Sequence, residues 1–247
     1  VMTTFGFTPV APHPLLLPYV AKMWVFESSG RLPAEDTKLI VPNANFKLTL
    51  TYTNGMVARI AGNTFVQPEG QLSLSGLIDS PTVLDTQADA PTGTIVIELT
   101  PHGAYRLFHL SYAEIKNEIV LLPDVLGKRV NELCAKFSDT SDATAKLGLL
   151  QAFLIKQLMV SSPDPIYDHC IKLIMETRGT VTVAQLERAT GYSARWLHRK
   201  FMQHAGMGAK DLSSIVRFKQ LYGVFSAAAK ADELNDHLYA YYYDRSH

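Results

Sequence analysis

The most informative part of the chain is residues 181–206, VTVAQLERATGYSARWLHRKFMQHAG, which predict two short helices around a tight turn. Thr182, followed three residues later by Gln185, fits a capping box at the start of the first helix. Gly191 stands where this helix must end and the chain must turn sharply. Ser193 can then cap a second helix. The sequence therefore predicts a helix-turn-helix.

The second of these helices would have two chemically different faces. Leu197 and Phe201 are four residues apart and would share an apolar inner face. The outer edge would carry long side chains that can hydrogen-bond, namely Arg195, His198, Arg199, Lys200 and Gln203. A helix that reads the major groove of DNA needs this combination. We therefore predict these five residues as DNA contacts.

The five side chains suit different contacts. Arg195 and Arg199 can fork onto O6 and N7 of guanine, and His198 can hydrogen-bond a base or a phosphate. Lys200 suits a phosphate contact, which positions a protein on DNA without specifying the sequence. For the two arginines, ordinary solvated charge on a helix surface is the alternative.

The stretch GYSARWLHRKFMQHAGMGAKDL, followed by IVRFKQLYGVF, resembles the DNA-binding domain of AraC/XylS-type transcription regulators. The matching positions are Ser193, Leu197, Arg199, Phe201, Gly206, Met207 and Arg217. Gly208 and Ala209 stand where the family usually has Ser-Pro, which should loosen the start of the following long helix. On that helix we expect Arg217 to form a structural ion pair rather than a DNA contact.

The family domain carries two such motifs in tandem, and residues 233–247, ELNDHLYAYYYDRSH, resemble the beginning of the second one. The matching positions are Tyr242, Asp244, Ser246 and His247, while Tyr241 stands where the family has Gly. Most of the second reading helix would lie past His247. We therefore expect one complete DNA-reading element and a fragment of another, as in a truncated sequence.

Length and composition are compatible with two domains. The chain has 247 residues, of which 47% are hydrophobic and 19% charged, so it can bury ordinary cores. The net charge is zero, and residues 163–247 hold only eleven Lys and Arg against nine Asp and Glu. Attraction to phosphate must therefore come from local clustering, as at residues 195–200. We place the boundaries at 1–122, 123–162 and 163–247.

The first of these regions is predicted to be rich in β-strands. In FKLTLTYTNGMVARI, residues 46–60, apolar and polar side chains alternate and Asn54-Gly55 supplies a hairpin turn. Further strands are expected at Lys38–Val41, Gln71–Leu77 and Thr94–Leu99. The order of PLLLPYVAKMWVFE, IVPNANFKLTL, LSGLI and IELTPHGAYRLF also resembles the N-terminal domain of one AraC-like subgroup. That resemblance implies a cupin-like barrel that senses a signal or oligomerises.

Two helices are predicted to bridge the halves. Asp124 can cap a helix that reaches about Phe137, and a second helix is expected from about Ala143 to Met159. They could pack on the β domain or form a homodimer interface, and the pattern leaves both open. Asp164-Pro165, after the linker at residues 161–163, predicts the start of the next helix. The expected fold class is α+β, with an all-α helix-turn-helix domain at the C-terminal end.

Enzyme chemistry has little support in the sequence. The histidines and glutamates that could hold a metal in the N-terminal region are His13, His102, His109, Glu98 and Glu114, and no H-x-H pair joins them. His102 is expected in a loop. Acyl-transfer and nucleotide-binding motifs are lacking. We predict no cofactor, no metal and no enzymatic activity, with a metal-dependent cupin enzyme as the least favoured alternative.

Cys134 and Cys170 are predicted to be buried, reduced thiols. The first residues lack the basic start of a secretory signal, and no apolar run suggests a membrane span. We expect a cytoplasmic protein. The leading hypothesis is a transcription regulator that binds double-stranded DNA. A β-barrel module that binds a small-molecule effector, with an inactive DNA-binding part, is the alternative.

Overall fold

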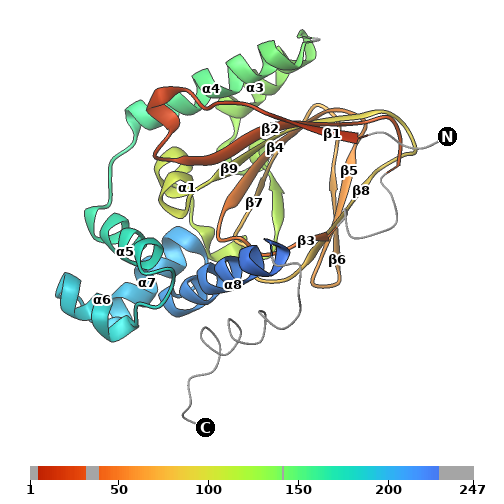
Figure 1. Cartoon of the computed structure of the whole chain (residues 1–247). Coiled ribbons are helices and arrows are strands. Elements are labelled where there is room, and N and C mark those ends of the chain that lie inside the picture. The colour runs from red at the N-terminus through yellow and green to blue at the C-terminus, as the bar shows by residue number, and fades with distance from the viewer. Residues whose placement is uncertain (1–4, 32–38, 141, 228–247) are drawn as a thin grey trace.

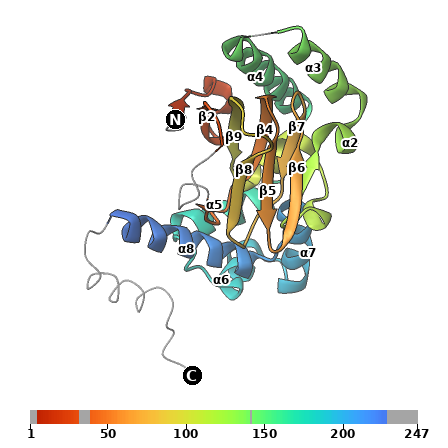
Figure 2. The same ribbon diagram turned by 90° about the vertical axis from the view of Figure 1, so that its right-hand side faces the viewer.

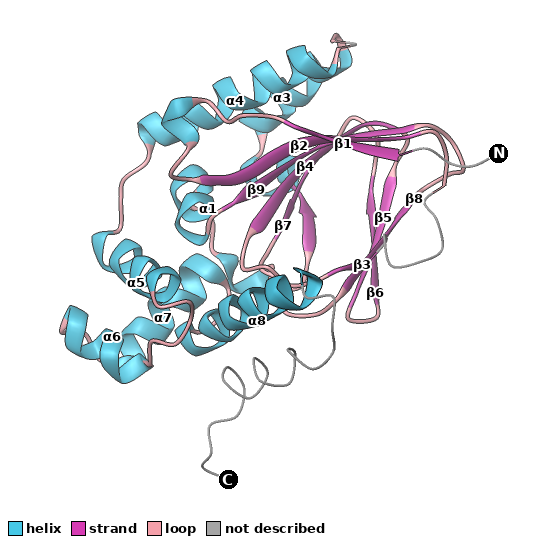
Figure 3. Ribbon diagram, viewed as in Figure 1, coloured by secondary structure: helices cyan, strands magenta, loops and turns pink. Residues whose placement is uncertain are grey.

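The computed structural model describes residues 5–31, 39–140 and 142–227 of the chain (Figure 1). Two antiparallel sheets form the N-terminal part, and helices cover one of them and make up the C-terminal part (Figure 3). The α+β fold class expected from the sequence is therefore confirmed. The partial second motif at residues 233–247 lies outside the described residues.

The larger sheet, sheet A, has six strands in the order β1-β2-β9-β4-β7-β10. These strands are β1 (Phe5–Pro9), β2 (Val20–Ser28), β9 (Thr92–Leu99), β4 (Phe46–Thr53), β7 (Leu72–Ser75) and β10 (Ile119–Leu121). Sheet B has four strands in the order β3-β8-β5-β6. They are β3 (Leu39–Ile40), β8 (Thr82–Thr86), β5 (Met56–Ile60) and β6 (Asn63–Gln67). The three short strands expected around residues 38–41, 71–77 and 94–99 are thus confirmed as β3, β7 and β9.

The alternation along β4 separates the two faces of sheet A. Phe46, Leu48 and Leu50 belong to the main hydrophobic cluster, which the surrounding helices complete. Lys47 and Thr49 point the other way, toward sheet B, where they line a cavity together with side chains of that sheet. The polar face of the strand is therefore covered by a second sheet instead of facing water.

The predicted hairpin at Asn54-Gly55 is wrong. Strand β4 pairs with β7 and β9, whereas β5 pairs with β6 and β8, so the turn carries the chain from one sheet to the other. Asn54 adopts a positive φ of 55°, and its Nδ2 donates to the carbonyl of Ala88 and to Oγ1 of Thr92 at 2.9 Å each. These non-local bonds, which the turn sequence cannot reveal, fix the corner.

Helices and short 3-10 turns pack on the apolar face of sheet A (Figures 1 and 2). They are η1 (Pro14–Leu16), α1 (Pro101–Phe108), η3 (Tyr112–Glu114), α2 (Leu122–Leu126), α3 (Lys128–Ser138) and α4 (Ala143–Val160). His102 lies in the first turn of α1 and not in a loop, because Thr100 caps this helix and accepts from the Gly103 N–H. The expectation for His102 is therefore corrected.

The two bridging helices are only partly as expected. Gly127, with φ of 64° and ψ of −139°, breaks the first into α2 and α3, so Asp124 lies inside α2 and is not a cap. A glycine at positive φ stops a helix that the apolar pattern alone would continue. The second helix agrees with the sequence, and Asp142 caps it by accepting from the Ala145 N–H at 3.0 Å.

Judged by length and composition alone, α4 could cross a membrane, which differs from the expectation that no apolar run is long enough. Core helices of other proteins pass the same test. Here α4 packs against α1, α3 and η1 and buries Leu147, Leu150 and Leu154 in the main cluster. The structure therefore gives this helix a packing role along the β domain.

Four helices follow the linker at residues 161–164: α5 (Pro165–Glu176), α6 (Val183–Thr190), α7 (Ala194–Ala205) and α8 (Ala209–Ala227). Asp164 caps α5 and Pro165 is its first residue, as the sequence predicts. The hydrophobic cluster continues from the helices on sheet A into α5, α6, α7 and α8 without a break. In both views α8 lies beneath the sheets (Figures 1 and 2).

Candidate nucleic-acid interface

The α6-turn-α7 unit has the local signals that the sequence predicts. Thr182 and Gln185 form a reciprocal capping box, with Thr182 N donating to Gln185 Oε1 at 2.7 Å and Gln185 N to Thr182 Oγ1 at 3.2 Å. Gly191 ends α6 in the left-handed region at φ of 75°. Ser193 caps α7 by accepting from the Trp196 N–H. These local hydrogen bonds and the turn at Gly191 fix where α6 begins and ends and where α7 begins.

A further contact across the turn was not predicted. The Glu187 carboxylate, on α6, accepts from the Ala194 N–H at 2.5 Å and so satisfies one of the free amides at the start of α7. A carboxylate at a helix N-terminus also interacts favourably with the helix dipole. Glu187 therefore ties α7 to α6, the helix before it.

The inner face of α7 is buried, as expected. Leu197 and Phe201 are 1% and 0% exposed and pack with Leu186 of α6 in the main cluster. The Phe201 ring lies 5.2 Å from the ring of Tyr167 on α5, edge to face. This core holds α7 in a fixed orientation on α5 and α6.

The outer face of α7 carries four of the five predicted contact residues. The exposed side chains are Arg195, His198, Arg199 and Gln203. Within the described part of the chain, none of the four forms a hydrogen bond or an ion pair. Their hydrogen-bonding groups are therefore available to a partner that approaches this face.

Lys200 is placed differently from the other four. Its amine forms an ion pair with Asp164 at 2.7 Å and lies 5.1 Å above the ring of Trp196. Trp196 in turn stacks on Tyr192, with 4.1 Å between ring centroids. The charge of Lys200 is thus already neutralised at the edge of the helix, and the sequence pattern gave no sign of this.

The side of α7 that faces away from the four exposed residues forms a joint with the β domain, which sequence reasoning missed. His204 is 3% exposed, and its Nε2 donates to the Asp164 carboxylate at 2.9 Å. The Tyr105 ring, on α1, lies 3.8 Å from the His204 ring. Gly206 packs so closely on η3 that an added Cβ would lie 2.3 Å from the Tyr112 carbonyl oxygen.

Burial and pairing shift the acidities at this joint. Burial disfavours the charged form of Asp164, but hydrogen bonds from Lys200 and His204 outweigh it and lower the pKa of the carboxyl. Burial lowers the pKa of His204 despite the neighbouring Asp164 carboxylate. The ring is therefore neutral at pH 7, with the proton on Nε2, and its buried Nδ1 has no protein partner among the described residues.

Arg217 has the structural role expected of it, although through a different partner. Its guanidinium donates to the Gly179 carbonyl at 2.5 Å and to Ser214 Oγ at 2.9 Å. The bond to Gly179 ties α8 to the turn between α5 and α6. A backbone carbonyl thus replaces the expected acidic partner.

The candidate metal ligands of the N-terminal region are not brought together. Glu98 is buried on β9 and accepts from the side-chain amides of Asn43 and Asn45 at 2.6 and 3.2 Å. His13 caps η1, and His109 ends α1 in the left-handed region. Among the described residues, no three His, Cys, Asp or Glu side chains form a group that could hold a metal ion.

Both cysteines are buried and free, as predicted. Burial raises the pKa of the Cys134 thiol, and it raises the pKa of Cys170 to about 11. A thiol with a raised pKa carries little thiolate at pH 7 and is a poor nucleophile. The two residues therefore act as small apolar groups in the core.

Residues 8–121 match a family model described as a domain of unknown function (DUF6597). No curated protein matches the sequence closely enough to count as a relative.

Solved structures that resemble this chain include the following three. Apo ToxT from Vibrio cholerae is 12% identical with a TM-score of 0.44, covering 99% of this chain and 89% of its own. The cupin domain of Cnp3 from Schizosaccharomyces pombe is 10% identical with a TM-score of 0.31, covering 40% and 69%. A cupin domain of an XRE family transcriptional regulator from Enterobacter cloacae is 11% identical with a TM-score of 0.30, covering 38% and 94%.

Proposed function

We propose that this protein is a sequence-specific DNA-binding transcription regulator of the AraC type, and that α7 reads the major groove. The observation that carries the proposal is the outer face of α7. Arg195, His198, Arg199 and Gln203 are exposed there and have no partner in the described part of the chain. Capping and a buried inner face hold them on a rigid helix, as base recognition requires.

The roles of the five side chains follow from their positions. Arg195 lies in the first turn of α7, the end of a recognition helix that enters the groove most deeply, and Arg199 lies one turn further along the same face. Both can fork onto guanine. His198 and Gln203 flank them and can contact a base or a phosphate. Lys200, which is paired with Asp164, serves at the rim of the interface.

We propose that the β domain senses a signal or oligomerises, with the outward side of α4 as the surface for a homodimer, and that the protein acts in the cytoplasm on chromosomal DNA. The boundaries at residues 122 and 162 separate these activities. A non-enzymatic role is part of the same proposal.

The proposal is tested by selecting genomic DNA fragments with the full chain. We expect one sequence motif to be enriched at moderate salt and lost on Arg195→Ala. In a titration with the enriched site, Arg195→Ala and Arg199→Ala should each weaken binding by about 1–3 kcal/mol. Binding to unrelated DNA should weaken far less, because base contacts discriminate while phosphate contacts do not.

Arg129→Ala is the matched control. Arg129 is an exposed arginine on α3, so the change removes the same charge at a site remote from α7 (Figure 1). Its binding should equal that of the unchanged protein. Equal loss with all three variants, or uniform retention of all fragments, would contradict base reading by α7.

A further inference from the structure

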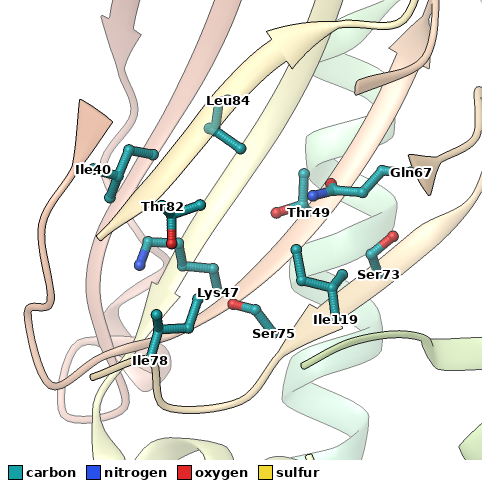
Figure 4. A pocket seen from close by; sticks show the side chains of 10 residues that line it. All are labelled: Ile40, Lys47, Thr49, Gln67, Ser73, Ser75, Ile78, Thr82, Leu84 and Ile119. Atoms are coloured by element: carbon teal, nitrogen blue, oxygen red, sulfur yellow. The ribbon is translucent and has the colours of Figure 1, made fainter. Parts of the chain in front are cut away.

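Polar side chains line part of the space between the two sheets. A cavity of about 40 Å³ lies there (Figure 4). Sheet A contributes Lys47, Thr49, Ser73 and Ser75, and sheet B contributes Gln67 and Thr82; apolar side chains complete the wall. The main hydrophobic cluster lies on the other side of sheet A, under the helices. A polar interior of this kind needs an explanation, because burying hydroxyl and amide groups costs free energy unless they are hydrogen-bonded.

Several of the lining groups lack a protein partner. Ser73 Oγ, Ser75 Oγ and Gln67 Oε1 are buried and form no hydrogen bond within the described residues. Their side chains are 1%, 5% and 6% exposed, so bulk water does not satisfy them. Buried polar groups in folded proteins are nearly always paired. The three groups together therefore indicate that something polar occupies the cavity.

The charged group that lines the cavity is positive. Among the residues that the structure describes, Lys47 is the only charged one that lines it, and no hydrogen bond or ion pair links its amine to them. Burial lowers the pKa of Lys47, which the nearby Glu98 opposes and Lys219 reinforces. Glu98, the cross-strand neighbour of Lys47, keeps its negative charge, but it forms no hydrogen bond or ion pair with the Lys47 amine. An anion in the cavity would give that amine a direct partner.

We propose that this cavity binds a small oxyanion of three or four non-hydrogen atoms, held by the Lys47 amine and the hydroxyls of Ser73, Ser75 and Thr82. A lysine and three hydroxyls supply donors from both sheets. The Gln67 amide can add a fifth donor group after a 180° rotation, since its oxygen and nitrogen are interchangeable in shape. The volume equals about three water molecules, which excludes sugars and nucleotides. Formate, acetate and nitrate have the right size and charge.

The test is thermal unfolding of the full chain in increasing sodium formate, with sodium gluconate added to keep the ionic strength constant. Gluconate is too large for the cavity. At ten times the half-saturating formate concentration, the melting temperature should rise by roughly 3–6 °C. Lys47→Met should abolish this rise. Lys22→Met, which removes an exposed lysine from the same sheet, should retain it.

Three outcomes would overturn the proposal. The first is an equal response to formate and gluconate, which would mean that the cavity holds water only. The second is an unchanged response to formate in Lys47→Met. The third is loss of the response in Lys22→Met. If Lys47→Met does not fold, Ser75→Ala provides the same test with a smaller change, and it should weaken formate binding at least threefold. The line width of ¹³C-formate in NMR, measured with each variant, reports binding independently of stability.

Discussion

At the scale of single residues, Asp164 has three roles, and the sequence around it indicates only one of them. It caps α5 by accepting from the Tyr167 N–H at 3.1 Å, and it binds Lys200 and His204 of α7. The sequence revealed only the first of these roles, because a cap depends on neighbours in the chain. The other two depend on residues 36 and 40 positions away.

The first prediction concerns pH. Burial lowers the pKa of His204 in the folded protein below an unfolded value of about 6.5. The unfolded chain therefore binds more protons than the folded one as the pH falls below about 6.5, and the free energy of unfolding decreases there. His204→Asn should make this decrease shallower. Urea unfolding at pH 7.5, 6.5, 6.0 and 5.5 measures the slope.

His169→Asn is the control for this prediction, because His169 is exposed on α5. It should leave the slope unchanged. Part of the slope will also remain in His204→Asn, since burial lowers the pKa of His102 and His109 as well. An identical slope in the unchanged protein and in His204→Asn would show that His204 is not held neutral by burial.

The second prediction compares two glycines to separate the cost of backbone strain from the cost of overpacking. Gly191 and Gly206 both end helices in the left-handed region, at φ of 75° and 72°. Nothing lies within 4 Å of a Cβ at Gly191, so Gly191→Ala should cost only the conformational strain, about 1–2 kcal/mol. A Cβ at Gly206 would also meet the Tyr112 carbonyl, and overpacking of this kind adds about 1–3 kcal/mol. Equal losses in denaturant unfolding would contradict the close packing.

At the scale of elements, the helices were predictable where short-range hydrogen bonds define them. Thr182, Gln185, Gly191 and Ser193 mark the ends of α6 and α7 by chemistry within a few residues, and the structure agrees. The break at Gly127 was missed because an apolar stripe continues on both sides of it. Local patterns thus locate a helix better than they locate an interruption in it.

The strands show the limit of the same reasoning. Alternation correctly placed Phe46, Leu48 and Leu50 on one face of β4, but it could not tell which strands lie alongside. The turn Asn54-Gly55 suits a hairpin, yet contacts to residues 87–92 turn it into a corner between sheets. For the candidate site, the exposed residues of α7 were predictable from spacing, whereas the pairing of Lys200 was not.

The third prediction applies to α7 as a DNA-contacting element and rests on the proposed function. Each phosphate contact made by a free cation contributes about −0.9 to the slope of log binding constant against log salt. Lys200 is already neutralised by Asp164, so Lys200→Gln should change this slope by well under one. Titrations of the selected DNA site at four salt concentrations measure it. Loss of a full unit would mean that Lys200 leaves Asp164 on binding DNA.

At the scale of the whole molecule, one hydrophobic cluster joins the helices on sheet A to α5, α6, α7 and α8. The joint between α7 and the β domain adds the Tyr105–His204 ring contact and the approach of Gly206 to η3. Parts that share a buried core are expected to unfold together. The proposed boundary at residue 162 therefore does not imply that the two parts fold independently.

The fourth prediction tests this coupling with the two tryptophans of the chain. Trp24 lies on β2 and Trp196 on α7, so a Trp24→Phe variant reports on the helices and a Trp196→Phe variant on the β domain. Urea unfolding followed by fluorescence should give coincident midpoints in the two variants after correction for their overall stability by circular dichroism. Two separated transitions would show that the halves fold independently.

The contact of Gly206 with the Tyr112 carbonyl also limits how such a gene can recombine. A crossover near residue 162 would join these helices to a foreign β domain, whose backbone at this place would leave either a gap or an overlap. The two halves are therefore expected to fit each other better than they fit parts taken from other proteins. Under the proposed function, new specificities can still arise by point mutation on the outer face of α7, because that face lies away from the joint and changes there leave it intact.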